Sequence, residues 1–202
     1  MSWCSFFHRC SFIYLLNIKI MEKTKNICNT DGLVVLVAES AEEKMVQQFL
    51  PEVKCIRMGV GASNVIKACS QLPAGTRVFN IGYAGSNELN IGTVTAVSKT
   101  YRLKDDTYVF EDYNNPLELS KDGYPCYTNN SFVTSTDKTE PTLFDMEMNY
   151  IAAFPLKFEG AIKIVSDNLS VDAFKNNAIR ESGILTSPEV WEKVARLFHE
   201  MI

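Results

Sequence analysis

Histidine is scarce in this sequence, and its scarcity argues against two common kinds of active site. The 202 residues include only two, His8 and His199, which lie near opposite ends of the chain. A Ser-His-Asp triad or a histidine-rich zinc site would have to be built from these two. If the chain is an enzyme, we therefore expect carboxylates to carry its proton transfer.

An excess of positive charge is also absent. The chain has 20 lysines and arginines against 24 aspartates and glutamates, which gives a formal net charge of -4. Surfaces that bind nucleic acid usually carry a basic excess, so we expect no nucleic-acid partner. The length suits one domain, and a hydrophobic content of 46% is typical of a globular protein with a buried core.

Closely spaced cysteines are missing too. The six cysteines include no C-x-x-C pair, so we expect no metal or redox site. Cys55 and Cys69 lie in apolar segments, where we interpret them as small core residues. Scattered free thiols fit a reducing compartment, so we predict a cytoplasmic protein.

The first 20 residues differ from the rest of the chain. Residues 11–18 are apolar but too few to span a bilayer. The only early charge is Arg9, and no A-x-A cleavage site follows. We interpret residues 1–20 as an N-terminal extension upstream of a true start at Met21, and residues 21–202 as a single domain. A weak signal sequence or membrane anchor is the alternative, and we expect no membrane partner.

Glycine-rich nucleotide-binding motifs are incomplete. Gly59-Val60-Gly61 precedes a predicted helix, but Asn64 stands where a dinucleotide fingerprint has its third glycine, and the turn follows the second predicted strand. The chain also has no GxxxxGK[ST] motif, so we exclude Rossmann and P-loop sites. A tight turn that needs glycine is the favoured interpretation. An anion site at the helix N-terminus is the alternative.

The first half of the chain predicts strands that alternate with helices. The predicted strands cover 33–38, 53–58 and 77–81, and the predicted helices cover 40–50 and 63–72. Ser40 resembles a helix N-cap, and the small residues at 82–85 predict a turn. This alternation is typical of an α/β domain with a largely parallel sheet.

The second half mixes strand and helix patterns. Strand-like segments cover 91–103, 127–136 and 162–165, a polar loop-like segment covers 104–123, and helical periodicity covers 143–154. An N-cap and a proline at Ser187-Pro188 open an amphipathic C-terminal helix. We therefore expect longer, partly antiparallel strands in the middle of the chain.

Carboxylates near the ends of predicted strands are the candidates for chemistry, because ligands of open α/β sheets bind outside the carboxyl ends of the strands. Asp167 directly follows the last predicted strand, where it fits a catalytic group and a turn cap equally well. In the helix before that strand, Asp145 and Asn149 share a face that we assign to solvent. Glu147 points elsewhere. A solvated glutamate is the favoured interpretation there, and a buried acceptor for hydroxyl donors is the alternative.

Six segments together resemble the purine nucleoside phosphorylase/uridine phosphorylase superfamily, and within it the 5′-methylthioadenosine/S-adenosylhomocysteine nucleosidases. They are VVLVAESAEE (34–43), MGVGASNVIKA (58–68), FNIGYAGSNELNIGTVTAVS (79–98), FVTSTD (132–137), FDMEMNYIAAF (144–154) and IKIVSDNLS (162–170). The resemblance implies a three-layer α/β/α sandwich with a mixed, largely parallel central sheet. It also implies cleavage of the N-glycosidic bond of a nucleoside without cofactor or metal, in a homodimer or larger homo-oligomer.

The resemblance assigns roles to residues of this chain. Asp167 matches the acid that protonates the leaving purine at N7, and Glu147 matches the glutamate that holds the ribose hydroxyls, with Met146 against the sugar. Glu42 matches the carboxylate that activates water, although its neighbour Glu43 leaves the register open by one. The backbone that lines the ribose and nucleophile pocket matches Gly61, Gly82, Ala84 and Gly85.

Several positions depart from the family pattern. Lys138-Thr139 stands where an aromatic–aliphatic pair is expected, Met58 replaces a hydroxyl residue, and Lys163 stands where an arginine is common. The segment that leads into FDMEM is also short. These departures leave the base and the 5′ substituent open.

Three functions remain as hypotheses. Attack by water gives a purine nucleosidase, which Glu42 and the lack of an arginine cluster favour. Attack by phosphate gives a nucleoside phosphorylase, for which Arg57 and Lys163 are the basic candidates, although Arg57 is more simply placed in solvent. The third hypothesis is a degenerate member that binds nucleosides without turnover.

Overall fold

The computed structural model describes residues 30–101, 116–177 and 183–202. The predictions made for residues 1–20 and for most of the polar segment 104–123 therefore lie outside the described residues. The elements in chain order are β1 (Val34–Val37), α2 (Ser40–Phe49), β2 (Lys54–Arg57), α3 (Ala62–Cys69), β3 (Arg77–Ser86), β4 (Val94–Tyr101), β5 (Pro116–Glu118), β6 (Tyr124–Thr128), β7 (Leu143–Asp145), α4 (Met148–Ala152), β8 (Lys157–Asp167), α5 (Val171–Asn177), the 3-10 helix η1 (Ile184–Thr186) and α6 (Pro188–Met201).

β3 is the centre of a sheet of mixed strand directions. β1 pairs with β2 and β3 in parallel, and β8 pairs with β3 in parallel along most of its length. β4 lies antiparallel to β8, and β6 lies parallel to both β4 and β7. β7 then returns to β3 in an antiparallel pairing that sets Phe144 opposite Gly85.

These pairings close a ring in the order β3-β8-β4-β6-β7-β3, while β1 and β2 continue from β3 as an open parallel edge. The predicted mixed sheet is confirmed. The predicted plain three-layer sandwich is wrong in part, because the sheet curls into a barrel-like closure. The short strand β7 causes the difference, since it joins β6 back to β3.

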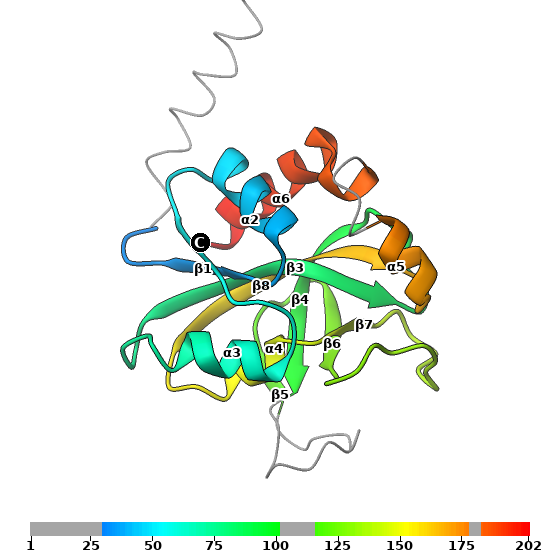
Figure 1. The fold of residues 1–202 in the computed structure, drawn as a ribbon, viewed down its shortest axis with the longest axis horizontal. Helices are drawn as coiled ribbons and strands as arrows, with labels where there is room; N and C mark the ends of the chain where they lie inside the picture. Colours follow the sequence, from blue (N-terminus) through cyan, green and yellow to red (C-terminus); the bar gives the residue numbers. More distant parts are fainter. Residues whose placement is uncertain (1–29, 102–115, 178–182) are drawn as a thin grey trace, which may run out of the picture.

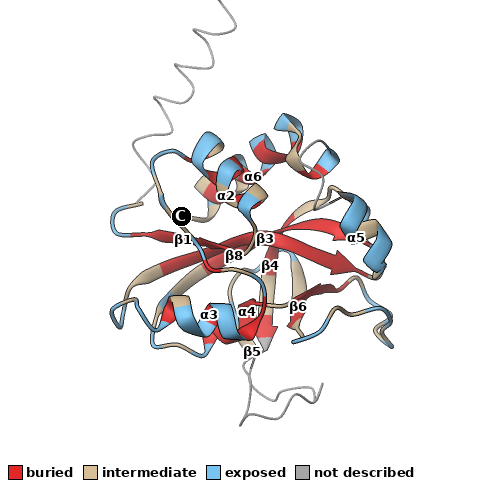
Figure 2. Cartoon of the chain, in the orientation of Figure 1, coloured by how far each residue is buried: buried red, intermediate tan, exposed pale blue. Residues whose placement is uncertain are grey.

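Helices cover both faces of the open part of the sheet (Figure 1). α2 and α6 lie on one face, and α3 and α4 lie on the other. Successive side chains of β1 point to opposite faces. Val35 accordingly packs in the cluster that contains Trp191 of α6, whereas Leu36 packs with Val65 of α3 and Ile151 of α4. Figure 2 shows the resulting buried strands between the two helical layers.

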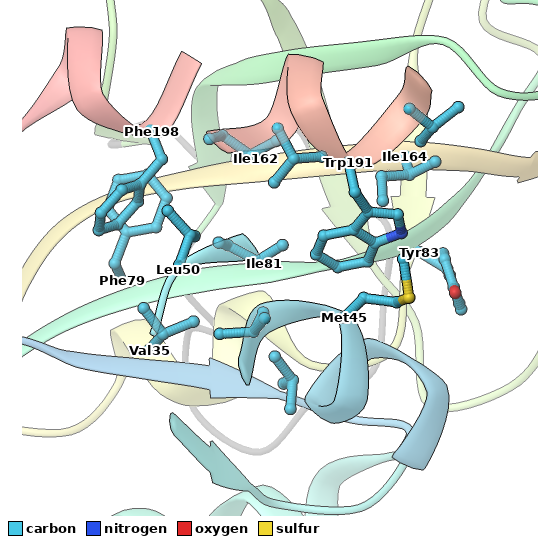
Figure 3. Packing of buried hydrophobic residues seen from close by; sticks show 14 of the residues in the cluster. Val35, Met45, Leu50, Phe79, Ile81, Tyr83, Ile162, Ile164, Trp191 and Phe198 are labelled. Atoms are coloured by element: carbon cyan, nitrogen blue, oxygen red, sulfur yellow. The ribbon is translucent and has the colours of Figure 1, made fainter. Parts of the chain in front are cut away.

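The C-terminal helix is confirmed as predicted. α6 begins at Pro188 after the cap Ser187, whose side chain accepts the N–H of Val190. Trp191 and Phe198 are fully buried, and Figure 3 shows both against the sheet. The ring of Phe198 meets that of Phe79 on β3 edge-on, with the ring centroids 5.1 Å apart. This packing fills one face of the sheet with apolar side chains.

The turn predicted at 82–85 is wrong. These residues form the carboxyl half of β3, which pairs with β8 as far as Gly85 opposite Asp167. Small residues permit a turn, but backbone hydrogen bonds to two neighbouring strands hold this segment extended. The extension carries β3 to the same sheet edge as the end of β8.

The helix predicted at 143–154 is also wrong in part. Its first three residues form β7, and α4 begins only at Met148. Phe144 lies opposite Gly85 of β3 on one side and Tyr127 of β6 on the other. Pairing with strands that are distant in the sequence outweighs the local apolar periodicity. For this reason the periodicity alone predicted a helix where β7 forms. The strand-like segment 127–136 likewise shortens, because β6 ends at Thr128.

The thiols in the described ranges are free. Cys69 and Cys126 are buried and Cys55 is half-buried, which agrees with the interpretation of Cys55 and Cys69 as packing residues. Across the described ranges, every helix is too short or too polar to cross a lipid bilayer.

Candidate active site

A cavity opens at the carboxyl ends of β1, β3 and β8. Six residues proposed from the sequence line it: Glu42, Ala84, Gly85, Met146, Glu147 and Asp167. The remaining two proposed residues, Gly61 and Gly82, do not line the cavity but contact residues that do. Gly61 donates its N–H to Glu147, and Gly82 lies beside Glu42. The rest of the described lining consists of Ala38, Glu39, Val60, Tyr83, Ser131, Phe132, Val133, Phe144, Asp145, Ser166, Leu169 and Phe174.

Asp167 is the last residue of β8 and is 1% exposed. The hydroxyl of Ser166 donates to its Oδ2 at 2.7 Å, and the N–H of Leu169 donates to its Oδ1 at 2.9 Å. Burial raises the pKa of this carboxyl above its ordinary value, and the hydrogen bonds offset only part of that rise. A carboxyl in this setting can hold a proton nearer neutral pH and deliver it into the cavity.

Glu42 lies in the first turn of α2, which is capped by Glu39 and not by the predicted Ser40. Three backbone N–H groups donate to its carboxylate at 2.8 Å, those of Ala38 and Glu39 to Oε2 and that of Tyr83 to Oε1. Burial raises its pKa despite these hydrogen bonds. Glu42 is therefore a fixed proton acceptor in the cavity wall.

The structure separates Glu42 from its neighbour Glu43. Glu43 is only half-buried, and its Oε2 lies 3.6 Å from Nε of Arg57. The side chain of Arg57 is 50% exposed, as expected from the sequence. Neither residue is among the described residues that line the cavity. Glu42 is thus the member of the pair that faces the candidate site.

Glu147 is the N-cap of α4 and is 6% exposed, so the solvated interpretation is wrong. Its Oε1 accepts the N–H of Gly61 at 2.9 Å, and its Oε2 accepts the N–H of Met146 at 3.3 Å. Gly61 adopts a left-handed φ of 83°, which favours glycine at this turn. Burial, and then the negative charge of Asp145, raise the pKa of Glu147 to about 7.

Asp145 and Lys163 form a buried ion pair. The Nζ of Lys163 lies 2.7 Å from Oδ2 of Asp145. The expectation that Asp145 and Asn149 face solvent is wrong. They are 5% and 2% exposed, because β7 is paired with β3 and β6 and α4 packs against β6. The hydroxyl of Thr100 donates to Oδ1 of Asn149 at 2.6 Å. Lys163 is thus engaged by Asp145, and it lies outside the described lining.

Two glycines of β3 allow the carboxylates to approach the strand. A Cβ on Gly85 would lie 2.8 Å from Oδ1 of Asp167, which is closer than real Cβ contacts allow. A Cβ on Gly82 would lie 3.3 Å from Oε1 of Glu42 and 3.6 Å from Nζ of Lys163. The small residues of this strand therefore make room for the carboxylates.

The sequence analysis missed the apolar wall of the cavity. Phe132 and Val133 follow β6 in an irregular segment, and the ring of Phe132 lies 5.5 Å from that of Phe174 on α5. Phe132 and Val133 thus line the cavity as an aromatic–aliphatic pair that precedes Asp137, whereas Lys138-Thr139, which follows it, lies outside the described lining. The signal was available, because Phe132-Val133 begins the matching segment FVTSTD.

Comparison with known proteins gives no match by sequence. No family model matches the chain. No curated protein matches it either.

Comparison of structures finds nucleosidases. An MTAN of Chlamydia trachomatis aligns with a TM-score of 0.57 at 18% identity, over 84% of this chain and 98% of that one. The futalosine hydrolase of Helicobacter pylori gives 0.57 at 12% identity, over 82% and 97%. A putative 5′-methylthioadenosine/S-adenosylhomocysteine nucleosidase of Francisella philomiragia gives 0.56 at 13%, over 84% and 97%. The chain therefore shares its fold with these nucleosidases.

Proposed function

We propose that this chain is a purine nucleosidase, which uses water to cleave the N-glycosidic bond of a nucleoside of the methylthioadenosine/S-adenosylhomocysteine type. The observation that carries the proposal is the meeting of Asp167, Glu42 and Glu147 around one cavity. Proteins of similar fold support it. The Chlamydia trachomatis MTAN has been solved bound to MTA, and a Helicobacter pylori MTAN has been solved with 5′-methylthioadenosine in its active site.

The proposed role of Asp167 is to protonate the leaving base. A purine leaves poorly until it gains a proton, so the reaction needs a general acid. Asp167 gives its proton to N7 while the C1′–N9 bond breaks and its electron pair passes to the purine. Phe132 and Phe174, which line the cavity, offer the base an apolar wall.

The proposed role of Glu147 is to hold the sugar. Its carboxylate accepts hydrogen bonds from the 2′- and 3′-hydroxyls, and its charge opposes the positive charge of the oxocarbenium-like sugar. The N–H groups of Gly61 and Met146 already orient the carboxylate. Met146 packs against the ribose in this arrangement.

The proposed role of Glu42 is to activate water. As the water oxygen bonds to C1′, Glu42 takes one water proton, and the sugar keeps the hydroxyl. The base leaves with the proton from Asp167, so the products are the free base and the free sugar. Exchange with solvent returns a proton to Asp167 and removes one from Glu42.

Phosphate attack has less support. A phosphate nucleophile needs cations or several N–H donors to bind it. The described lining contains no lysine, arginine or histidine. Of the two basic candidates, Arg57 lies beside Glu43 and Lys163 lies against Asp145. A phosphate in the cavity would instead meet five carboxylates, those of Glu39, Glu42, Asp145, Glu147 and Asp167.

Base release from methylthioadenosine, S-adenosylhomocysteine and adenosine in phosphate-free buffer tests the proposal. We expect release by the unmodified protein, loss of release in Asp167→Asn and Glu42→Gln, and retained release in Glu43→Gln as the matched control. Release that appears only when phosphate is added would replace this proposal with a phosphorylase. Nucleoside binding without release under either condition would replace it with a non-catalytic binding protein.

The resemblance adds expectations about assembly and location. We propose a homodimer or larger homo-oligomer in the cytoplasm, acting in purine nucleoside metabolism and methionine salvage. Light scattering of the purified chain at several concentrations measures the assembly. A monomer at every concentration would contradict the expected oligomer.

A further inference from the structure

The order of the strands relates the base end of a bound nucleoside to the part of the cavity near its 5′ substituent. Across the open part of the sheet the strands lie in the order β2-β1-β3, and β8 lies beside β3. This step rests on the proposed function, in which Asp167 at the end of β8 binds the base. The base and the 5′ carbon leave the ribose ring in diverging directions. If the base lies at the end of β8 and the ribose lies at β3, a 5′ substituent that continues across the sheet reaches the ends of β1 and β2.

That end of the cavity contains a carboxylate without a role in the proposed reaction. Ala38 and Glu39 follow β1, Val60 follows β2, and all three line the cavity. Strands are about 4.8 Å apart, so the end of β1 lies roughly 10 Å from the end of β8, which a nucleoside can bridge. Glu39 is half-buried, and Val60 is an apolar residue of the same cavity lining.

The position of Glu39 is defined by its neighbours. It is the N-cap of α2 and forms the capping-box arrangement with Glu42. Its negative charge acts on the hydroxyl of Tyr83, whose pKa is raised by burial first and by Glu42 and Glu39 next. Tyr83 is 7% exposed and lines the cavity. Among the described residues its hydroxyl has no hydrogen-bond partner, so the lining near Glu39 includes one buried hydroxyl that a ligand could pair.

We propose that Glu39 selects nucleosides whose 5′ substituent carries an N–H or O–H donor over nucleosides with an apolar 5′-alkylthio group. A donor such as a 5′-hydroxyl or an ammonium forms a charge-assisted hydrogen bond with the carboxylate. An alkylthio group displaces water from the carboxylate and returns no hydrogen bond. Because hydrogen bonds to charged groups contribute more than neutral ones, we expect a preference of about 10- to 100-fold.

Three nucleosides that differ in the hydrogen-bond donor of their 5′ substituent test this proposal. Adenosine offers a 5′-hydroxyl, S-adenosylhomocysteine offers an ammonium on a longer arm, and methylthioadenosine offers neither. We expect the unmodified protein to show a lower kcat/KM for methylthioadenosine than for at least one of the other two. Glu39→Met is expected to reverse that order. Glu39→Gln keeps an acceptor oxygen, so it should retain the preference for the hydroxyl and lose that for the ammonium.

Glu43→Met is the matched control, since Glu43 lies on the same helix outside the described lining. It should leave the order of the three substrates unchanged. Melting curves of both Glu39 variants show whether the substitution destabilises α2 by removing its cap. A lost cap would also lower the turnover of all three nucleosides together, whereas a changed specificity alters their order. A preference for methylthioadenosine in the unmodified protein, or an order that Glu39→Met leaves unchanged, overturns the proposal.

Binding affinities for the three nucleosides test the role of Glu39 independently of whether the protein catalyses base release. If none of the nucleosides releases its base, the nucleosidase proposal fails, and the role of Glu39 is then read from calorimetric dissociation constants. The same order of preference and the same reversal in Glu39→Met are expected there. Equal affinities for the three nucleosides in the unmodified protein and in Glu39→Met would overturn the role of Glu39 by itself.

Discussion

The ammonium of Lys163 on β8 lies 2.7 Å from Oδ2 of Asp145 on β7, and the two side chains are 1% and 0% exposed. The other oxygen of Asp145 accepts the hydroxyl of Thr128 on β6 at 2.5 Å. The N–H of Met148 donates to Oδ2 at 3.1 Å. The pair thus connects three strands of the closed ring, and it places a positive charge close to the carboxylates of the candidate site.

Removing Lys163 should destabilise the fold strongly. Lys163→Met leaves the Asp145 carboxylate buried without its cation, and breaking one partner of a buried ion pair costs about 3–5 kcal/mol. Urea unfolding measures the loss. A change within about 0.5 kcal/mol, as is typical of surface substitutions, would contradict a structural role for the pair.

The double variant Lys163→Met with Asp145→Asn is the control for this prediction. The amide that Asp145→Asn introduces is neutral and can still accept the hydroxyl of Thr128, so the double variant should recover about 1 kcal/mol or more relative to Lys163→Met. A double variant less stable than Lys163→Met alone would show that the charge of Asp145 is not the source of the cost.

Asp167→Asn should remove turnover while the protein stays folded. The amide cannot give a proton to N7, and loss of a general acid costs roughly 100- to 10,000-fold in rate. Ser166 and Leu169 can still hold the side chain, so the melting temperature should change little. The measurement is kcat beside a melting curve. Full activity in Asp167→Asn would require another acid.

Glu147 should make the stability depend on pH. Its pKa is about 7 in the folded protein against an ordinary 4.5. Below about pH 4.5 the carboxyl is protonated in both states, and its contribution is the same in each. As pH rises from there to about 7, the unfolded chain ionises first, so the free energy of unfolding falls by on the order of 1–3 kcal/mol.

Glu147→Gln isolates this effect from those of Glu42 and Asp167, whose raised pKa values act in the same direction. Urea unfolding at pH 5 and pH 7.5 should show a smaller loss of stability for the variant than for the unmodified protein. Equal losses in the two proteins would contradict a raised pKa for Glu147.

Gly85→Ala should lower turnover more than stability. The added Cβ would lie 2.8 Å from Oδ1 of Asp167, so the carboxylate has to move. Gly160→Ala is the matched comparison, because its Cβ would meet the ring of Phe79 at 2.8 Å within the core. We expect kcat/KM to fall chiefly in Gly85→Ala and the melting temperature to fall chiefly in Gly160→Ala. The reverse pattern would contradict the claim that Gly85 makes room for the Asp167 carboxylate during catalysis.

The elements with strong local signals could be predicted from the sequence. β1 is a continuous apolar run, and α6 has a serine cap, a proline and a regular apolar face. The position of Asp167 after a buried strand was also evident. These features depend on neighbouring residues, which is why a single sequence reveals them.

The features that depend on distant partners could not be predicted in this way. Glu147 is buried because Gly61, 86 positions away, donates to it. Asp145 is buried because Lys163 supplies a cation from another strand. The barrel-like closure depends on β7, whose local pattern resembles a helix. The family resemblance therefore identified the residues of the site, but their burial and hydrogen-bond partners became known only from the structure.

The origin of the oxygen on the released sugar tests the central proposal most directly. The reaction is run in H₂¹⁸O with phosphate present, and the sugar product is analysed by mass spectrometry. A nucleosidase gives free sugar that carries ¹⁸O at C1′ in the unmodified protein, and none in Asp167→Asn. Formation of a sugar 1-phosphate would contradict attack by water, and the absence of any sugar product would contradict catalysis.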